Sequence, residues 1–357
     1  MDNNTQLNDE LLEQDEQNEL YEHYRIVVDK GQDLLRIDKF LQLRLSNISR
    51  NKIQLAAKSS CVLVNGAPVK SNYKVKPLDV ITILLPTPPQ NTEVFPEYIP
   101  LNIVYEDDDV LVIDKQPGLV VHPGYANFNG TLLNGLVYYF QNKLDKNGNP
   151  IIPYLVHRID KDTSGLLLIA KNEESQIVLS KQFFEHTINR KYNALVWGDF
   201  DDQSGTIIGN LGRSLKDRRI MSVYPYDESL PDDQQKGKHA VTHWNVLERF
   251  GYTTLVECVL ETGRTHQIRA HMKHIGHPLF NDTAYGGNMI LKGTTFSKYC
   301  QFVNNCFQIM PRQALHAVVI GFVHPSTGKT MYFESKLPKE FSDLISKWRD
   351  YASFVKP

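Results

Sequence analysis

Cysteine is scarce in this sequence, and long apolar runs are missing. Only four cysteines occur in 357 residues, and no two of them are spaced as a CxxC pair. This usage is typical of a reducing compartment, so we expect a cytoplasmic protein. No apolar run approaches the roughly 18 to 20 residues of a membrane-spanning helix, and the polar N-terminus does not have the pattern of a signal peptide. We therefore expect no membrane association.

Motifs for phosphate-binding cofactors and for metals are missing as well. The sequence has no GxxxxGKS loop and no HExxH motif. Four histidines are closely spaced: His266, His271, His274 and His277. Without a cysteine pair or an HExxH pattern beside them, these histidines fit packing or RNA contact better than metal binding. We expect neither a metal nor a cofactor.

Charge is unevenly distributed along the chain. Eight of the 41 acidic residues lie within residues 1–23, which contain no Lys or Arg. The rest of the chain therefore holds 33 acidic against 39 basic residues, and this excess permits a polyanionic partner. Residues 1–23 are rich in Asn, Gln and acid, so we expect them to form a disordered acidic tail.

Residues 24–85 are expected to form a small basic α+β domain. Apolar residues recur at helical spacing between positions 37 and 45, and a second short helix follows. Asn65-Gly66 between apolar residues predicts a hairpin, and Val80–Leu85 is expected to be a strand. Basic helix faces beside a hairpin suit phosphate binding, although the solvated surface of a structural domain would have the same composition. The candidate RNA contacts here are Arg36, Lys39, Arg50 and Lys52.

Five prolines in residues 86–100 predict a stiff linker. The second domain then covers residues 101–357. Its runs of strands with separated helices favour an α+β fold, and we find no internal repeat. Residues 201–240 are expected to be rich in loops and basic.

Polar and ionisable residues are concentrated just before the apolar run Leu166–Ala170. The run is short and follows a glycine, so it is expected to be a buried strand. Asp160 and Asp162 are two positions apart, and an extended backbone would place both on one face, as paired carboxylates for glycosidic-bond chemistry. Asp162 begins a segment with good turn chemistry and is interpreted as structural. The guanidinium of Arg158 would keep a partly buried Asp160 ionised, as a nucleophile must be, although spacing alone more often indicates a structural ion pair.

Tyr192 and two arginines are further candidates. Tyr192 alternates with small apolar residues in a predicted strand, which favours a core position, but its phenol can equally stack on a base. Arg264 and Arg269 are placed to meet an anion, either a phosphate or a carboxylate such as Asp160.

Longer motifs carry two family resemblances. The order of RIDKFLQLRLSNISRNKIQ, VLVNGAPVK and LDVITI resembles the small RNA-binding module named for ribosomal protein S-four. HRIDKDTSGLLLIAK, RKYNALVWG, ETGRTHQIRAHMKHIGHPL and RQALHA, in this order, are similar to the RluA/RluD-type pseudouridine synthase family, over residues 100–340. HPLFNDTAYGG is similar to the RluD-like branch. Ile159 stands where Leu is more usual, which is a volume-conserving change.

The second resemblance implies a fold, a reaction and three catalytic residues. The fold would have a central, mostly antiparallel sheet flanked by helices and loops. A uridine within RNA would be isomerised: its base leaves C1′, turns and is rejoined through C5. By the resemblance, Asp160 is the nucleophilic carboxylate, Tyr192 stacks on the target base, and Arg269 pairs with the aspartate. The order of the steps stays open between attack at C1′, attack at C6 and removal of a ribose proton.

RNA is the partner that both resemblances imply. The target nucleotide must be extruded from its stack, at a cost of a few kcal/mol. Arg158 matches the residue that enters the stack in its place, and His157 and Arg264 are expected to contact RNA beside it. The RluD-like resemblance implies large-subunit ribosomal RNA as the substrate, with transfer RNA as the alternative, and we expect a monomer.

Two other functions remain open from the sequence alone. One is a ribosome-associated RNA-binding protein without catalytic activity, although the presence of Asp160 argues against it. The other is a glycoside hydrolase or metal-dependent hydrolase built on Asp160 and Asp162 or on the histidines.

Overall fold

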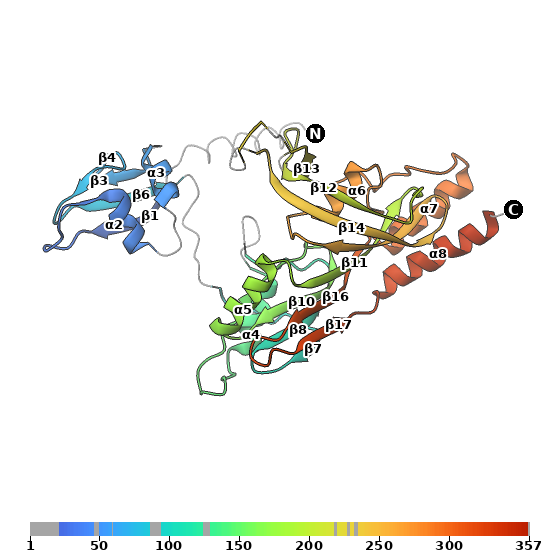
Figure 1. Cartoon of the computed structure of the whole chain (residues 1–357), viewed down its shortest axis with the longest axis horizontal. Coiled ribbons are helices and arrows are strands. Elements are labelled where there is room, and N and C mark those ends of the chain that lie inside the picture. Colours follow the sequence, from blue (N-terminus) through green and yellow to red (C-terminus); the bar gives the residue numbers. More distant parts are fainter. Residues whose placement is uncertain are drawn as a thin grey trace, which may run out of the picture. The chain divides into compact units, whose positions relative to one another are not determined.

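Two units make up the chain, and each has its own hydrophobic core. The units are Met1–Glu93 and Val94–Pro357, so the division lies within the proline-rich stretch (Figure 1). The computed structural model describes residues 21–45, 50–58, 60–85, 94–123, 129–217, 220–226, 229–231 and 235–355.

The described residues of the first unit form a four-stranded antiparallel sheet, a two-stranded sheet and two helices. The sheet order is β1 (Tyr21–Val27), β6 (Val80–Leu85), β3 (Val62–Val64) and β4 (Ala67–Pro68). A second, two-stranded sheet joins β2 (Leu35–Arg36) to β5 (Lys74–Val75), and the helices are α2 (Ile37–Arg44) and α3 (Arg50–Lys58). Asn65 and Gly66 both have positive φ, 51° and 83°, as the tightest hairpin turns require, so the predicted hairpin is confirmed.

The predicted end of the acidic tail and the predicted end of the linker both differ from the structure. β1 begins at Tyr21 and pairs with β6, so the last three residues assigned to the acidic tail belong to a strand. Residues 1–20 and 86–93 lie outside the described part of the chain. The end of the linker is part of the second unit, because Asn134 Nδ2 donates to the Phe95 carbonyl at 2.9 Å and Glu97 N donates to the Asn134 carbonyl at 3.2 Å. Neither boundary carries a local signal, since both depend on pairing with distant residues.

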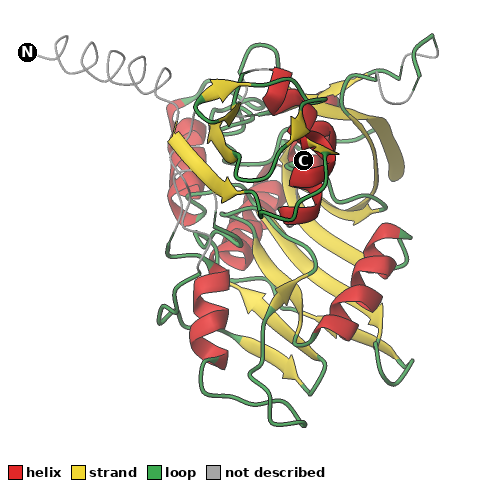
Figure 2. Ribbon diagram, turned by 90° about the vertical axis from the view of Figure 1, so that its left-hand side faces the viewer, coloured by secondary structure: helices red, strands yellow, loops and turns green. Residues whose placement is uncertain are grey.

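The second unit is built on one large sheet. Its strands are β7 (Ile103–Glu106), β8 (Val110–Lys115), β9 (Tyr154–Leu155), β10 (Ser164–Ala170), β11 (Asn189–Trp197), β12 (Ser204–Arg213), β13 (Met221–Tyr224), β14 (Lys238–Arg249), β15 (Thr253–Leu260), β16 (Leu315–Val323) and β17 (Thr330–Glu334). The order is β13-β12-β14-β15-β11-β16-β10-β8-β7, with β17 paired to β16 and β9 to β10. Only the β10–β16 pairing is parallel among the described strands, so the predicted mostly antiparallel α+β sheet is confirmed. In a view turned by 90°, the twisted sheet lies beside helices (Figure 2).

Helices cover both faces of this sheet. They are α4 (Leu132–Phe140), α5 (Glu173–Phe184), α6 (Gln267–His274), α7 (Ser297–Ile309) and α8 (Lys339–Val355). Alternate residues of β10 therefore enter different cores: Leu167 and Ile169 pack with residues of α4, whereas Leu166 and Leu168 pack with Leu179 of α5. Burial on both faces explains the continuous apolar run and confirms the predicted buried strand. No helix among the described residues is long and apolar enough to cross a membrane.

Residues 201–240 contain long loops, as predicted, but they also contain strands that were not predicted. These are β12 and β13, and β14 begins at Lys238. β12 contains three glycines, and neighbouring side chains pack closely against them. A Cβ at Gly205 would lie 2.6 Å from the Trp244 ring, and one at Gly209 would lie 2.4 Å from the Val223 side chain. This crowding cannot be seen in the sequence.

Candidate active site

A recess of about 50 Å³ lies where the loop before β10 meets the start of α6. Its wall includes all three predicted catalytic residues, Asp160, Tyr192 and Arg269, and two predicted RNA contacts, Arg158 and Arg264. Asp160 and Arg269 are 109 positions apart in the sequence. The fold therefore gathers, at one place on the sheet, residues that the sequence named from separate motifs.

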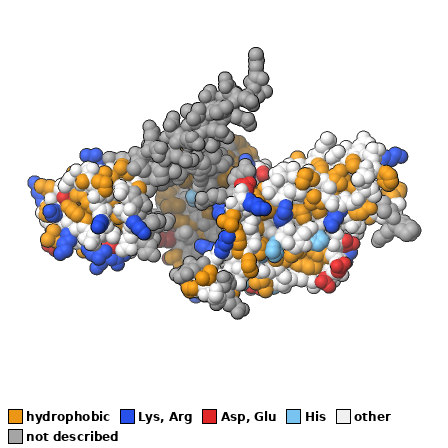
Figure 3. Space-filling model, turned by 90° about the horizontal axis from the view of Figure 1, so that it is seen from above, with side chains coloured by type: hydrophobic (Ala, Val, Ile, Leu, Met, Phe, Trp, Pro, Cys, Tyr) orange, Lys and Arg blue, Asp and Glu red, His pale blue; other side chains and the backbone are white. Residues whose placement is uncertain are grey.

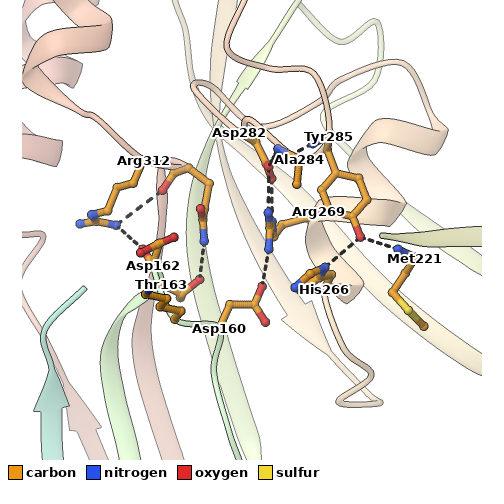
Figure 4. A network of polar contacts seen from close by, with 12 residues as sticks. Asp160, Asp162, Thr163, Met221, His266, Arg269, Asp282, Ala284, Tyr285 and Arg312 are labelled. Carbon is orange, nitrogen blue, oxygen red and sulfur yellow. Dashed lines mark hydrogen bonds and ion pairs between the residues drawn. The ribbon is translucent and has the colours of Figure 1, made fainter. Parts of the chain in front are cut away.

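Arg269 lies between two carboxylates (Figure 4). Its Nη1 donates to Asp160 Oδ2 at 3.1 Å. Its Nε and Nη2 donate to Asp282 Oδ2 and Oδ1 at 2.7 and 2.9 Å. Asp282 is fully buried, whereas the Asp160 side chain is 15% exposed. The bidentate pair fixes the guanidinium plane and leaves one edge for the exposed carboxylate.

The charge on Arg269 is secured by the same contacts. Burial alone would lower the pKa of Arg269, but the hydrogen bonds and charge of Asp282, together with Asp160, raise it above the usual arginine value. Tyr285 adds a ring whose centroid lies 4.9 Å from the guanidinium carbon. The role of Asp282 as the anchor of Arg269 had no sequence signal, because it depends on the turn after α6.

Long-range contacts hold the loop that carries Asp160. The Lys115 ammonium donates to three carbonyls, those of Gln116, Leu119 and Lys161, each at 2.9 Å. Burial lowers the pKa of Lys115 to about 7, against the raising effect of Asp162 and Asp160. Arg312 Nη1 donates to the Asp162 carbonyl at 2.9 Å. These backbone contacts set the position of Asp160 without touching its carboxylate.

Tyr192 is both a core residue and a pocket residue. It is 6% exposed, packs in the core beneath the site and also lines the recess. Burial raises the pKa of its phenol, as does Asp160, while Arg190 lowers it. The Tyr192 hydroxyl therefore stays protonated near neutral pH. Arg190, which the sequence reading passed over, is also buried in this wall and donates Nη2 to the Glu261 carbonyl at 3.3 Å.

Two residues beside Asp160 do not share its position. Asp162 is not part of the recess wall, so the two carboxylates do not form a glycosidase-like pair there. His157 is turned into the protein. Its Nε2 accepts the Leu168 N–H at 2.8 Å, its Nδ1 is buried, and its ring stacks on Phe183 at 4.7 Å. Burial lowers the pKa of His157 to about 3. His157 is partly exposed, but a contact with RNA could not use either ring nitrogen, because both are covered.

The four closely spaced histidines are directed to different places. His266 lines the recess, and His277 stacks on Phe200 with its Nδ1 2.8 Å from the Trp197 carbonyl. His274 is exposed, whereas His271 is fully buried and neither of its ring nitrogens has a hydrogen-bond partner among the described residues. Among the described residues, only Asp107, Asp109 and His324 approach one another as metal ligands do, and these three make hydrogen bonds within the protein.

On the face shown in Figure 3, the first unit carries several Lys and Arg side chains, with few acids between them. Arg36 and Arg50, however, both donate to the buried carboxylate of Asp38, with contacts of 2.9 to 3.1 Å. Burial alone would raise the pKa of Asp38, but these hydrogen bonds, with one from Gln54, hold it well below its usual value. Lys39 is exposed and makes no ion pair with another described residue. The side chain of Lys52 lies outside the described part of the chain.

Comparisons with known proteins identify the class of both units. The family model described as RNA pseudouridylate synthase matches residues 109–274, and that of the S4 domain matches residues 35–81. A protein of Chlorobaculum parvum named uncharacterized RNA pseudouridine synthase is 43% identical over 323 residues, which cover 90% of this chain and 96% of that one. Ribosomal large subunit pseudouridine synthase D of Zymomonas mobilis is 39% identical over 313 residues, which cover 87% and 92%.

A solved structure shares the fold. Human RNA pseudouridylate synthase domain containing 4 has a TM-score of 0.53 at 22% identity, over 70% of this chain and 93% of that one. The chain is thus an RNA-modifying isomerase with an S4 domain. It belongs to the RNA pseudouridylate synthase family.

Proposed function

We propose that this protein isomerises uridines of large-subunit ribosomal RNA to pseudouridine, with Asp160 as the nucleophile. The observation that carries the proposal is the partly exposed Asp160 carboxylate, which lies in a recess beside Tyr192 and 3.1 Å from the anchored guanidinium of Arg269. The ribosomal substrate is supported by the name of the Zymomonas mobilis relative, which is 39% identical.

The chemistry requires a bond exchange at one nucleotide. The N1–C1′ bond breaks, a C5–C1′ bond forms, and the proton on C5 is lost while N1 gains one. The reaction is redox-neutral and consumes no other substrate. A carboxylate facing the nucleotide can begin the reaction by attack at C1′, by attack at C6 or by removal of a ribose proton. The choice among these three first steps stays open.

The pocket supports a separate role for each side chain. Arg269, fixed by Asp282, orients Asp160 and keeps a positive charge beside it, so the carboxylate needs no reorganisation as charge develops. Tyr192 presents a ring at the recess on which the detached uracil can stack. The apolar neighbours Ile159 and Leu315 exclude water from the base while it turns.

RNA contacts surround the recess. Arg158 and Arg264 are both exposed, and we assign Arg158 to the space left by the flipped nucleotide and Arg264 to a phosphate. In the S4 domain, Lys39 is the candidate for a phosphate contact, whereas Arg36 and Arg50 contribute through their outward edges.

The proposal includes the setting in which the protein acts. We propose that the protein acts as a monomer, because a single chain supplies Asp160, Tyr192 and Arg269 to the recess. A ribosomal substrate agrees with the cytoplasmic location that cysteine usage indicates.

The substrate is tested by mapping pseudouridines in cells that lack this protein. Large-subunit RNA from the deletion strain should lose pseudouridine at one or more positions, and these should return when the wild-type gene, but not Asp160→Asn, is restored. If the pseudouridines are lost from transfer RNA while large-subunit RNA is unchanged, the ribosomal substrate is wrong. If no RNA changes, the proposed activity itself is contradicted.

A further inference from the structure

His266 occupies an unusual backbone position at the recess. It is the N-cap of α6 with φ 53° and ψ 25°, in the left-handed region that non-glycine residues rarely adopt. Its side chain makes no capping hydrogen bond to the helix. The conformation therefore costs free energy without stabilising the helix end, and such positions are concentrated at functional sites.

A hydrogen-bonded chain fixes the proton on the His266 ring (Figure 4). The Met221 backbone N–H donates to the Tyr285 hydroxyl at 2.9 Å, and that hydroxyl lies 3.1 Å from His266 Nδ1. Tyr285 is 2% exposed, and Nδ1 is the one acceptor near its own hydroxyl proton among the described residues. A buried hydroxyl proton without an acceptor is costly, so Tyr285 donates to Nδ1, and a neutral ring then carries its proton on Nε2.

The surroundings keep this ring neutral. Burial lowers the pKa of His266, and Arg269 lowers it further, against the opposing charge of Asp160. His266 Nε2 makes no hydrogen bond with any residue that the structure describes, and the ring lines the recess. A neutral ring whose Nε2 has no partner among the described residues thus lines the recess where the nucleotide must bind.

The chemistry of the wall indicates what accepts this hydrogen bond. The recess that His266 lines also includes apolar side chains, Leu260 and Ile268 among them, and the exposed arginines Arg158 and Arg264. A phosphate is better matched by the charged, solvated arginines. The neutral donor inside the wall suits a neutral acceptor, and an extruded uracil brings two carbonyl oxygens.

We propose that His266 is a uracil-binding residue, whose Nε2–H donates to a carbonyl oxygen of the flipped base, and that Tyr285 is the positioning residue that holds it in this tautomer. The inference rests on the proposed isomerisation at this recess. Asp160 and Arg269 act on the ribose–base bond, whereas His266 would bind the base itself.

Matched variants separate the donor from the fold. His266→Asn tolerates the left-handed backbone but has no donor at the Nε2 position, so kcat/KM should fall about 10- to 100-fold. His266→Gln places an amide N–H close to that position and should keep most of the activity. Tyr285→Phe retains the ring beneath Arg269 but loses the hydroxyl, and should lower kcat/KM about 3- to 10-fold. In the double variant Tyr285→Phe/His266→Asn, the two losses should not add.

The decisive experiment uses a synthetic RNA hairpin that carries the mapped target uridine, or 2-thiouridine or 4-thiouridine in its place. Sulfur accepts hydrogen bonds poorly, so the wild-type full-length protein should lose activity with one of the two analogues, measured by nucleoside chromatography. His266→Asn should show no further loss with that analogue. Equal losses in the wild type and His266→Asn with both analogues would overturn the proposal, as would wild-type activity of His266→Asn on the unmodified hairpin. Failure of the wild type on both hairpin and ribosomal RNA would instead contradict the proposed function.

Discussion

Asp282 should matter to the reaction although it never touches the nucleotide. Its buried carboxylate receives Arg269 Nε and Nη2 at 2.7 and 2.9 Å, and the backbone N–H groups of Ala284 and Tyr285 at 3.1 and 3.2 Å. Asp282→Asn preserves the size of the side chain but removes its charge. It also places an amide NH₂ group among donors, so at least one hydrogen bond is replaced by a repulsive contact.

The loss of stability in Asp282→Asn can be derived from the burial of the Arg269–Asp282 ion pair. Breaking a buried ion pair by removing one partner costs about 3–5 kcal/mol, and Asp282→Asn should lie at the low end of this range because Asp160 still offsets part of the Arg269 charge. A matched control is the surface pair of Glu248 with Arg349, which is equally bidentate at 2.7 and 2.6 Å. These side chains are 33% and 57% exposed, so Glu248→Gln should cost at most about 1 kcal/mol.

Unfolding in urea and turnover of the folded variant are the two assays. All three tryptophans, Trp197, Trp244 and Trp348, lie in the second unit, so their fluorescence follows its unfolding. At a temperature where Asp282→Asn is folded, kcat should fall about 100-fold, as a shift of about 1 Å in a catalytic group can cause. If Asp282→Asn and Glu248→Gln lose equal stability, or if Asp282→Asn keeps the wild-type kcat, the anchoring of Arg269 by Asp282 is refuted.

Three further predictions follow from buried or exposed single residues. Burial lowers the pKa of His271 to about 4. The unfolded chain, with a histidine pKa of about 6.5, therefore binds a proton that the folded chain does not, and stability is lost as pH falls from about 6.5 to about 4. His271→Leu should reduce the slope of the free energy of unfolding against pH in this range by up to about 1.4 kcal/mol per pH unit, measured by urea titrations. An unchanged slope would contradict a neutral His271. Lys39→Ala should weaken RNA binding and reduce the salt slope of log K by up to about 0.9, whereas an unchanged slope would show that Lys39 does not contact phosphate. Gly165→Ala should prevent folding of the second unit, because a Cβ at this residue would lie 2.2 Å from the Ala317 carbonyl oxygen; a normally folded variant, judged by tryptophan fluorescence, would show that β10 can shift there.

Much of the catalytic unit could be predicted because its signals are local. Leu166–Ala170 is apolar at every position, and the strand is covered on both faces. Asp160 and Tyr192 stand in motifs long enough to indicate the family, and the structure brings both to one recess with Arg269. Asn65-Gly66 gave the hairpin because only a few residues tolerate positive φ at both turn positions.

The parts that were missed depend on contacts between distant residues. Asp282 and Lys115 act on the site through pairs and carbonyls that no spacing rule connects with Asp160. Arg36 and Arg50 lie in a basic segment whose composition suits phosphate binding, but in the fold both donate to the buried Asp38. In each case the residue type was visible, but its partner was set by the tertiary fold.

The most direct measurement compares two carboxylates in one loop. RNA labelled with tritium at uridine C5 should release its label with the wild-type protein and with Asp162→Asn, in the presence of a chelator. Asp160→Asn should release none, although it should bind the RNA and unfold at a similar urea concentration. Release of tritium by Asp160→Asn would contradict nucleophilic action by Asp160. So would a wild-type protein that stops releasing tritium when the chelator is added.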